Sequence, residues 1–116
     1  MSTDSSCLFC RLVAGEIPAT IEARGDGFVA FRDIAPKAPV HVLVIPERHV
    51  ASLAGVAGLS DDERARMTPF IAKVAHDLGL DGSGYRVTTN HGEDARQSVF
   101  HLHWHILGGE RLSENM

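Results

Sequence analysis

Apolar and polar positions follow two patterns along this chain, one typical of helices and one typical of strands. In residues 7–14 the apolar positions recur every three to four residues, the spacing of one helix face, and Gly15 supplies a helix end. A longer apolar stripe of the same period runs through residues 61–78. It follows Ser60 and Glu63, a pair typical of a capping box. The pattern therefore predicts one short and one long helix.

Other segments are short, rich in β-branched or aromatic residues, and bounded by glycine or proline, which is typical of strands. Five strands are expected, at residues 20–23, 28–31, 40–45, 85–89 and 99–107. The first two are joined by an Arg-Gly-Asp-Gly turn and predict a hairpin. A helical turn is expected near residues 49–53. This order of elements predicts an α+β fold with a five-stranded, mostly antiparallel sheet.

Length and composition narrow the class of protein. The chain has 116 residues, of which 44% are hydrophobic, and a formal net charge of −4. We expect a loose tail at residues 1–6 and a single domain over residues 7–116. The absence of a basic stripe argues against a nucleic-acid partner, and the absence of a long apolar run argues against a membrane span. A polar start without signal-peptide features, and only two cysteines, favour a cytoplasmic location.

Three histidines, His101, His103 and His105, occupy alternate positions near the C-terminus. Alternate side chains of a strand share one face, and the residues between them, Phe100, Leu102, Trp104 and Ile106, share the other and favour a core. The histidine face has three explanations at this point. The rings could be structural, they could bind a catalytic metal, or one could attack phosphorus while its neighbours hold the phosphoryl oxygens.

The residues around these histidines resemble a known family signature. The run Gln-Ser-Val-Phe-His-Leu-His-Trp-His-Ile-Leu-Gly-Gly at residues 97–109 is similar to the motif of the histidine triad (HIT) superfamily, and in particular of its Hint branch of purine nucleoside phosphoramidases. Similar segments follow the same order at residues 9–18, 31–34, 38–46 and 77–80. The resemblance implies a HIT-like fold, a homodimer and a purine nucleotide substrate. It further implies hydrolysis of the P–N bond of adenosine 5′-phosphoramidates through a nucleotidyl-histidine intermediate.

The same resemblance implies roles for individual residues. His103 matches the nucleophile, while His105 and the Ser98 hydroxyl match the groups that bind the phosphoryl oxygens. Either His41 or His105 would pass a proton to the leaving amine, and the sequence leaves this choice open. Asp33 matches the carboxylate that accepts the ribose hydroxyls, although aspartate is also favoured there as a turn residue.

The implied nucleotide site extends beyond the triad. Four apolar residues match the slot for the purine, with core packing as the simpler alternative, and Asn90 matches a polar contact near the ribose and phosphate. The family usually has glycine at the position of Arg96, which could either reach the phosphate or crowd the pocket. The full set expected to bind nucleotide is Phe9, Leu12, Phe31, Asp33, Ile34, Asn90, Arg96, Gln97, Ser98, Val99, His103 and His105.

A second constellation concerns a metal. Some triad relatives hold a structural zinc, and the matching positions in this chain are Cys7, Cys10, His49 and His101. Two thiolates and two imidazoles complete a tetrahedral set, so such a site would be closed and structural. Without zinc, we expect His101 to orient the active site by hydrogen bonds. No catalytic cofactor is expected.

Three rival functions remain open from the sequence. One is a dinucleoside polyphosphate hydrolase of the same superfamily, against which the Gly-Gly end of the motif argues. Another is a nucleotide-binding regulator with little turnover, which the substitution at Arg96 keeps open. The last is a metalloprotein whose triad binds a catalytic ion.

Overall fold

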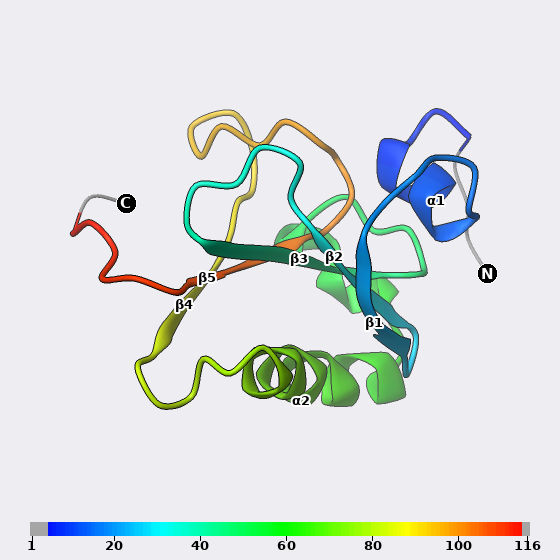
Figure 1. The fold of residues 1–116 in the computed structure, drawn as a ribbon. Coiled ribbons are helices and arrows are strands. Elements are labelled where there is room, and N and C mark those ends of the chain that lie inside the picture. Colours follow the sequence, from blue (N-terminus) through cyan, green and yellow to red (C-terminus); the bar gives the residue numbers. More distant parts are fainter. Residues whose placement is uncertain (1–4, 115–116) are drawn as a thin grey trace.

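A computed structural model describes residues 5–114, and residues 1–4 of the expected tail lie outside this range. The elements are α1 (Leu8–Val13), β1 (Ile21–Gly25), β2 (Phe28–Arg32), β3 (Val40–Pro46), the 3-10 helix η1 (Leu53–Gly58), α2 (Asp61–Asp77), β4 (Tyr85–Thr89) and β5 (Trp104–Gly108). The strands form one antiparallel sheet in the order β1-β2-β3-β5-β4 (Figure 1). The predicted α+β fold is confirmed.

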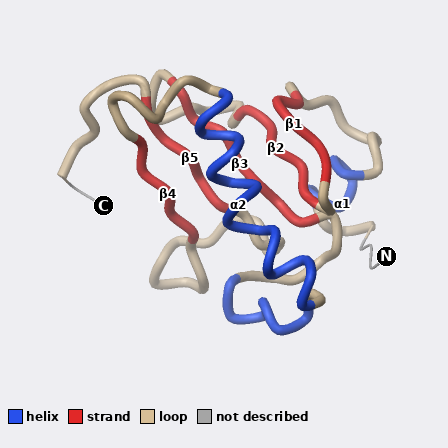
Figure 2. Tube along the Cα trace, turned by 90° about the horizontal axis from the view of Figure 1, so that it is seen from below, coloured by secondary structure: helices blue, strands red, loops and turns tan. Residues whose placement is uncertain are grey.

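The long helix α2 covers one face of the sheet, as Figure 2 shows from below. Its start is the predicted capping box, in which Ser60 N donates to Glu63 Oε1 at 2.7 Å and Glu63 N donates to Ser60 Oγ at 3.1 Å. Its apolar stripe packs against the sheet residues that point the same way. This first core contains Phe28, Val42, Val44, Phe70, Ile71, Val74, Leu102 and Ile106. Among the described residues, neither helix combines the length and apolar character needed to cross a membrane.

The short helix α1 lies on the other side and closes a second, smaller core. Phe9, Cys10 and Leu12 from α1 pack there with Phe31 and Leu43, which come from β2 and β3. Several residues expected at the site lie in or beside this second core, since Phe9 contacts the rings of His101 and His103. The single short helix therefore places the N-terminal cysteines and Phe9 next to the strands that carry the histidines.

The β1–β2 hairpin is tighter than predicted. Arg24 and Gly25 continue β1, so that only Asp26 and Gly27 form the turn. Both have positive φ angles, 58° and 89°, which a two-residue turn of this kind requires and which Asp and Gly tolerate. The four-residue turn expected from the sequence was therefore too long by two residues.

The last strand differs most from its prediction. It begins at Trp104 instead of residue 99, because Leu102 N donates to Val50 O at 2.7 Å and residues 99–103 join no ladder of the sheet. Leu102 and Ile106 are buried as expected, but Phe100 is 57% exposed and belongs to no core. The helical turn expected at residues 49–53 lies later, as η1. His101 and His103 thus precede the strand, and only His105 lies in it.

Candidate functional site

The ring of His103 has a defined protonation pattern. It is buried, and its Nδ1 lies 2.8 Å from the carbonyl oxygen of His101. A carbonyl can only accept, so Nδ1 carries the hydrogen and donates it. In the neutral ring, Nε2 therefore keeps its lone pair. The ring edge of Phe9 packs against it with centroids 5.3 Å apart, which limits how the imidazole can turn.

His105 and His41 form a second chain of bonds beside His103. The backbone N–H of Lys37 donates to His41 Nδ1 at 3.0 Å, so the hydrogen of the neutral His41 ring lies on Nε2. His41 Nε2 donates to His105 Nδ1 at 2.9 Å. The neutral His105 ring consequently carries its hydrogen on Nε2. The His105 and His103 ring centroids are 5.1 Å apart, so the two rings border one space.

Burial keeps the rings of His41 and His105 neutral. Burial first, and then the neighbouring His103 and His41, lower the pKa of His105 to about 4. Burial also lowers the pKa of His41, against the pull of the Asp33 carboxylate, which raises it. At neutral pH each ring therefore has one N–H and one lone pair, and the hydrogen-bond chain has one direction.

Asp33 is a turn residue, as one of its two expected roles required, and it also lies beside His41. Its Oδ1 accepts the backbone N–H of Ala35 at 2.8 Å, which is the turn geometry typical of aspartate. Its Oδ2 lies 3.4 Å from His41 Nε2. The carboxylate is half-buried and next to the histidine chain. The turn role and a position at the site are therefore compatible.

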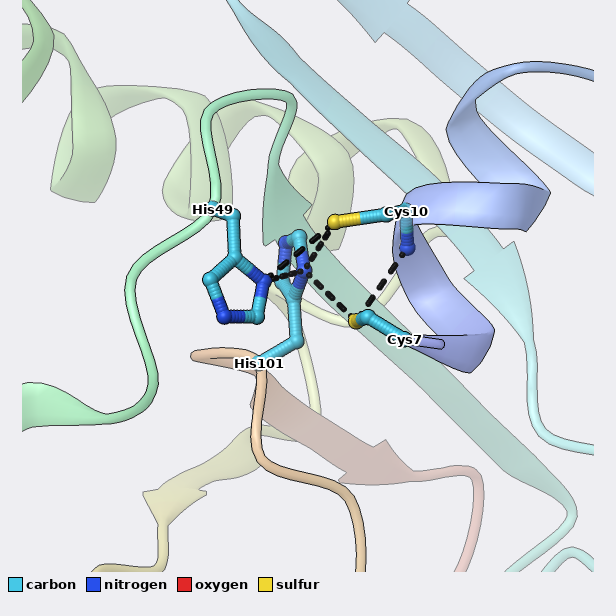
Figure 3. Close-up of side chains that lie close together, drawn as sticks. All are labelled: Cys7, Cys10, His49 and His101. Atoms are coloured by element: carbon cyan, nitrogen blue, oxygen red, sulfur yellow. Dashed lines mark hydrogen bonds between the residues drawn. The ribbon is translucent and has the colours of Figure 1, made fainter. Parts of the chain in front are cut away.

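Cys7, Cys10, His49 and His101 converge on one point, as Figure 3 shows. The cysteines come from the start of α1, His49 follows β3, and His101 precedes β5 (Figure 3). His101 Nδ1 lies 3.4 Å from Cys7 Sγ, 3.5 Å from Cys10 Sγ and 3.3 Å from His49 Nδ1. Cys10 Sγ lies 3.3 Å from His49 Nδ1. All four donor atoms lie within 4.8 Å of one another.

The donor set fits a zinc ion. Bond lengths of about 2.3 Å to sulfur and about 2.0 Å to nitrogen imply edges of roughly 3.3–3.8 Å between the ligands of a tetrahedral site. The distances from His101 Nδ1 and Cys10 Sγ have these values. His101 Nε2 donates to the Pro46 carbonyl at 2.8 Å, which leaves Nδ1 unprotonated and able to bind a metal. Burial lowers the pKa of His101 to about 4, which also favours this neutral form.

The apolar residues expected to form the purine slot divide into a buried group and one exposed member. Phe9 and Phe31 meet edge to face with centroids 5.4 Å apart, and Leu12 is buried beside them. These three are core residues of the second face, so the simpler alternative of core packing holds for them. Ile34 is 98% exposed and belongs to neither core of the described chain.

The loop between β4 and β5 carries the remaining expected residues. Asn90 directly follows β4 and is half-buried, whereas Arg96 and Ser98 are exposed and Val99 is half-buried. Arg96 has a φ angle of 63°, in the region that favours glycine, which gives a physical reason for the glycine that the family resemblance led us to expect there. The side chain of Gln97 is buried and hydrogen-bonded to backbone groups only.

The sequence did not anticipate an open cavity beside Ser98. It has a volume of about 530 Å³ and is lined by Ser6, Cys7, Leu8, His49, Ala51, Ser98, Val99 and Phe100. One wall belongs to the cysteine–histidine cluster and the other to the segment that leads into the triad. The backbone groups that orient the histidines, Lys37 N and the Pro46 and His101 carbonyls, were also missed, because no side-chain pattern reports them.

Comparisons with known proteins show the family and the fold of this chain. A family model described as HIT domain matches residues 14–112. The chain is 36% identical over 105 residues to a purine nucleoside phosphoramidase of Escherichia coli, covering 90% of this chain and 88% of that protein. It is 41% identical over 104 residues to an uncharacterized HIT-like protein of Helicobacter pylori, covering 90% and 97%. A solved histidine triad protein of Clostridium difficile superposes with a TM-score of 0.87 at 39% identity, covering 97% and 98%.

Proposed function

Because this chain belongs to the HIT domain family, we propose that it is a purine nucleoside phosphoramidase that hydrolyses the P–N bond of adenosine 5′-phosphoramidates. One observation carries the proposal: the bond from His103 Nδ1–H to the His101 carbonyl leaves a lone pair on His103 Nε2. The similarity to a protein named purine nucleoside phosphoramidase supports the choice of substrate.

In the first step, His103 Nε2 attacks the α-phosphorus of the substrate. The P–N bond breaks, its electron pair goes to the nitrogen of the leaving amine, and a nucleotidyl-histidine forms. Covalent catalysis of this kind replaces one difficult displacement by two easier ones. The packing of Phe9 on the ring and the bond to the His101 carbonyl support this role, since both restrict the imidazole to one orientation.

The leaving amine takes a proton, and the hydrogen-bond chain favours His105 as its donor. Because His41 Nε2–H donates to His105 Nδ1, His105 holds its own hydrogen on Nε2, beside His103. A proton lost from His105 Nε2 is matched by the shift of the His41 proton onto Nδ1. Because this shift alone would leave His41 as an anion beside the negative Asp33 carboxylate, His41 Nε2 takes up a proton from solvent in the same step, and the carboxylate favours this reprotonation.

In the second step, water attacks the nucleotidyl-histidine, His103 leaves, and the nucleoside monophosphate is released. Charge spreads over the phosphoryl oxygens in both transition states, so fixed donors there lower the barrier. The exposed Ser98 hydroxyl and His105 Nε2–H are the groups that we assign to this task. One such donor is typically worth roughly 3–4 kcal/mol.

The nucleoside half has a place on the second core. We assign the purine to the exposed side chain of Ile34 and to the part of the second core formed by Phe9, Leu12 and Phe31, because Ile34 is 98% exposed and lies close to Phe31 along the chain, directly after Asp33. We assign the ribose hydroxyls to the Asp33 carboxylate. The structural turn at Ala35 orients this carboxylate without occupying Oδ2.

We further propose that Cys7, Cys10, His49 and His101 bind a structural zinc ion. All four protein ligands would be used, so the ion would have no open position for catalysis. It would join α1, the end of β3 and the approach to β5 at one point. Reduced cysteines suit a cytoplasmic location, which we also propose.

A homodimer is proposed through the outer edge of β4. This strand ends the sheet and pairs only with β5, so one row of its backbone groups faces outward among the described strands. Tyr85 and Val87 are 38% and 37% exposed on it. A second copy related by a two-fold axis would extend the sheet across this edge. Replacing Val87 with lysine should shift the sedimentation coefficient towards the monomer.

The test of the function is direct. Purified protein is incubated with adenosine 5′-phosphoramidate while AMP release is followed, and the reaction is quenched early to detect a nucleotidylated peptide that contains His103. Hydrolysis of diadenosine polyphosphates in preference to the phosphoramidate would favour the rival hydrolase. AMP binding without turnover on either substrate would favour the regulator, and activity lost on chelation and restored by metal ions would favour the metalloenzyme.

A further inference from the structure

The side chain of Gln97 is saturated with hydrogen bonds to the backbone. Its Oε1 accepts from Gly92 N at 2.9 Å, and its Nε2 donates to Ala51 O at 2.8 Å and to Val99 O at 3.1 Å. Both amide hydrogens and the amide oxygen are therefore used within the chain. Gln97 has no amide hydrogen left for a nucleotide, although its place in the motif suggested a binding role.

We propose that Gln97 is a positioning residue that holds Ser98 in place for the phosphoryl group. The proposal rests on the function proposed above and deepens it. The bond from Gln97 Nε2 to Val99 O spans Ser98, so the residues on both sides of Ser98 are tied together. Gln97 N also donates to Gly92 O at 3.1 Å, which closes the loop of residues 92–97 from the backbone side.

The segment that receives these bonds is itself well anchored. Val50 O accepts Leu102 N at 2.7 Å, Ala51 O accepts Gln97 Nε2, and Ser52 Oγ lies 2.7 Å from His91 Nδ1. Each of the three successive residues 50–52 thus forms a hydrogen bond with one residue of the segment 91–102. His49, immediately before them, belongs to the cysteine–histidine cluster.

This arrangement accounts for the contrast between Ser98 and its neighbours. Gln97 is buried and fully bonded, whereas Ser98, the next residue, is exposed. A loop held on its inner side presents the Ser98 hydroxyl with little freedom to move. Donors that are already in place for the transition state lose no free energy to reorganisation during the reaction.

The chemistry at position 97 requires an amide. Gln97→Ala would leave the Gly92 N–H and two carbonyls without their partner, and an unpaired buried group is costly. Gln97→Glu keeps the size and the acceptor for Gly92 N–H. It replaces the donor with an oxygen that faces the Ala51 and Val99 carbonyls, so the two donated bonds are lost and the carboxylate repels both acceptors.

The experiment is a double-mutant cycle between Gln97 and Ser98 on phosphoramidate turnover. We expect Gln97→Glu to lower kcat about 30-fold or more while AMP affinity falls less than tenfold. Ser98→Ala should lower the kcat of the wild type strongly but that of the Gln97→Glu protein less than about threefold, since Ser98 is already displaced there. Additive effects would overturn the inference, because they would mean that Gln97 does not act through Ser98.

A second measurement does not depend on catalysis. The Gly92 amide proton, which donates to Gln97 Oε1, should exchange at least tenfold faster in Gln97→Ala than in the wild type, and an unchanged rate would overturn the inference. Asp94→Asn, an exposed change in the same loop, serves as the matched control and should leave exchange and turnover unaltered. If the wild type binds AMP without hydrolysing the phosphoramidate, the proposed reaction is wrong but the inference on Gln97 is still testable. The double-mutant cycle is then measured on AMP affinity.

Discussion

Two groups of histidines lie side by side in this protein, and they use the same ring in opposite ways. In the cysteine–histidine cluster, the Nδ1 atoms of His49 and His101 point at each other and at two sulfurs. In the second group, formed by His41, His103 and His105, His41 donates to His105 while His103 donates to the His101 carbonyl, so each ring has one donor and one acceptor nitrogen. The first arrangement suits a cation held at its centre. The second suits proton transfer towards an open site.

The difference depends on the partner of the other ring nitrogen. The Pro46 carbonyl takes the Nε2–H of His101 and so turns the Nδ1 lone pair towards the cluster. The His101 carbonyl takes the Nδ1–H of His103 and leaves Nε2 bare. Two carbonyls therefore decide which histidine is suited to bind metal and which is suited to attack phosphorus. Residue type alone would not separate them.

The largest expected effect comes from removing the proposed nucleophile, which belongs to the group of His41, His103 and His105. His103→Ala should abolish turnover, by at least about 10³-fold, because it removes the lone pair that we propose attacks phosphorus. AMP affinity should stay within about tenfold, since few ground-state contacts are lost. Turnover is measured by AMP release and affinity by calorimetry. Parallel losses of turnover and affinity would contradict a nucleophilic role and assign His103 to binding.

The corresponding change in the cysteine–histidine cluster should leave turnover nearly unchanged. Cys7→Ser removes one of the four metal ligands, so we expect bound zinc to fall below one equivalent and the melting temperature to fall by about 10 °C. The kcat of the folded protein should change by less than about threefold.

The control for this change is His76→Ala, which removes an exposed histidine outside both groups. Zinc content is measured by atomic absorption and stability by calorimetry. A wild type that contains no zinc and melts at the same temperature as Cys7→Ser would refute the metal site.

Most of the fold was accessible from the sequence because it depends on periodicity. The apolar stripe after Ser60, the capping box with Glu63 and the antiparallel sheet were all predicted correctly. The last strand was predicted five residues too early. The alternation of apolar residues continues back to Val99, but the partner of Leu102 is the Val50 carbonyl outside the sheet, a long-range bond that no local pattern encodes.

For the site, spacing indicated which residues meet but not what each ring does. The family resemblance named Cys7, Cys10, His49 and His101 together, and the structure brings their donor atoms within 4.8 Å. The tautomers depend on backbone groups far away in the chain, such as Pro46 O and Lys37 N, and were not predictable. Gln97 was expected at the nucleotide, yet its side chain binds only backbone. A buried amide and an exposed one have the same letter in a sequence.

A third prediction uses pH to test the buried, neutral state of His105 in the second group. The folded pKa of His105 is lowered to about 4 by burial, below the ordinary value of 6.5 in the unfolded chain. The unfolded state therefore binds more protons between these values, and the free energy of unfolding should fall as pH decreases from 6.5 to about 4. We expect His105 to account for about 2 kcal/mol of this fall, allowing for its partial exposure.

The measurement is chemical denaturation at several pH values for the wild type and His105→Gln, both at the same zinc loading. The variant should lose less stability over this pH range, because its side chain does not titrate. Acid release of a metal would affect both proteins alike and cancels in the difference. Identical slopes would contradict the buried, neutral state of His105.

The smallest expected effect concerns Ile34, on the proposed purine surface. Ile34 is 98% exposed, so it contributes little to folding, and we expect Ile34→Ser to change the free energy of unfolding by less than about 0.5 kcal/mol. If the purine covers this side chain, the same change should weaken AMP binding about fivefold, the value of roughly 1 kcal/mol of apolar contact. Leu53→Ser, at a 41% exposed position in η1, is the matched control and should leave AMP affinity unchanged. Equal AMP affinities for wild type and Ile34→Ser would remove Ile34 from the purine surface and confine that surface to the buried aromatic residues.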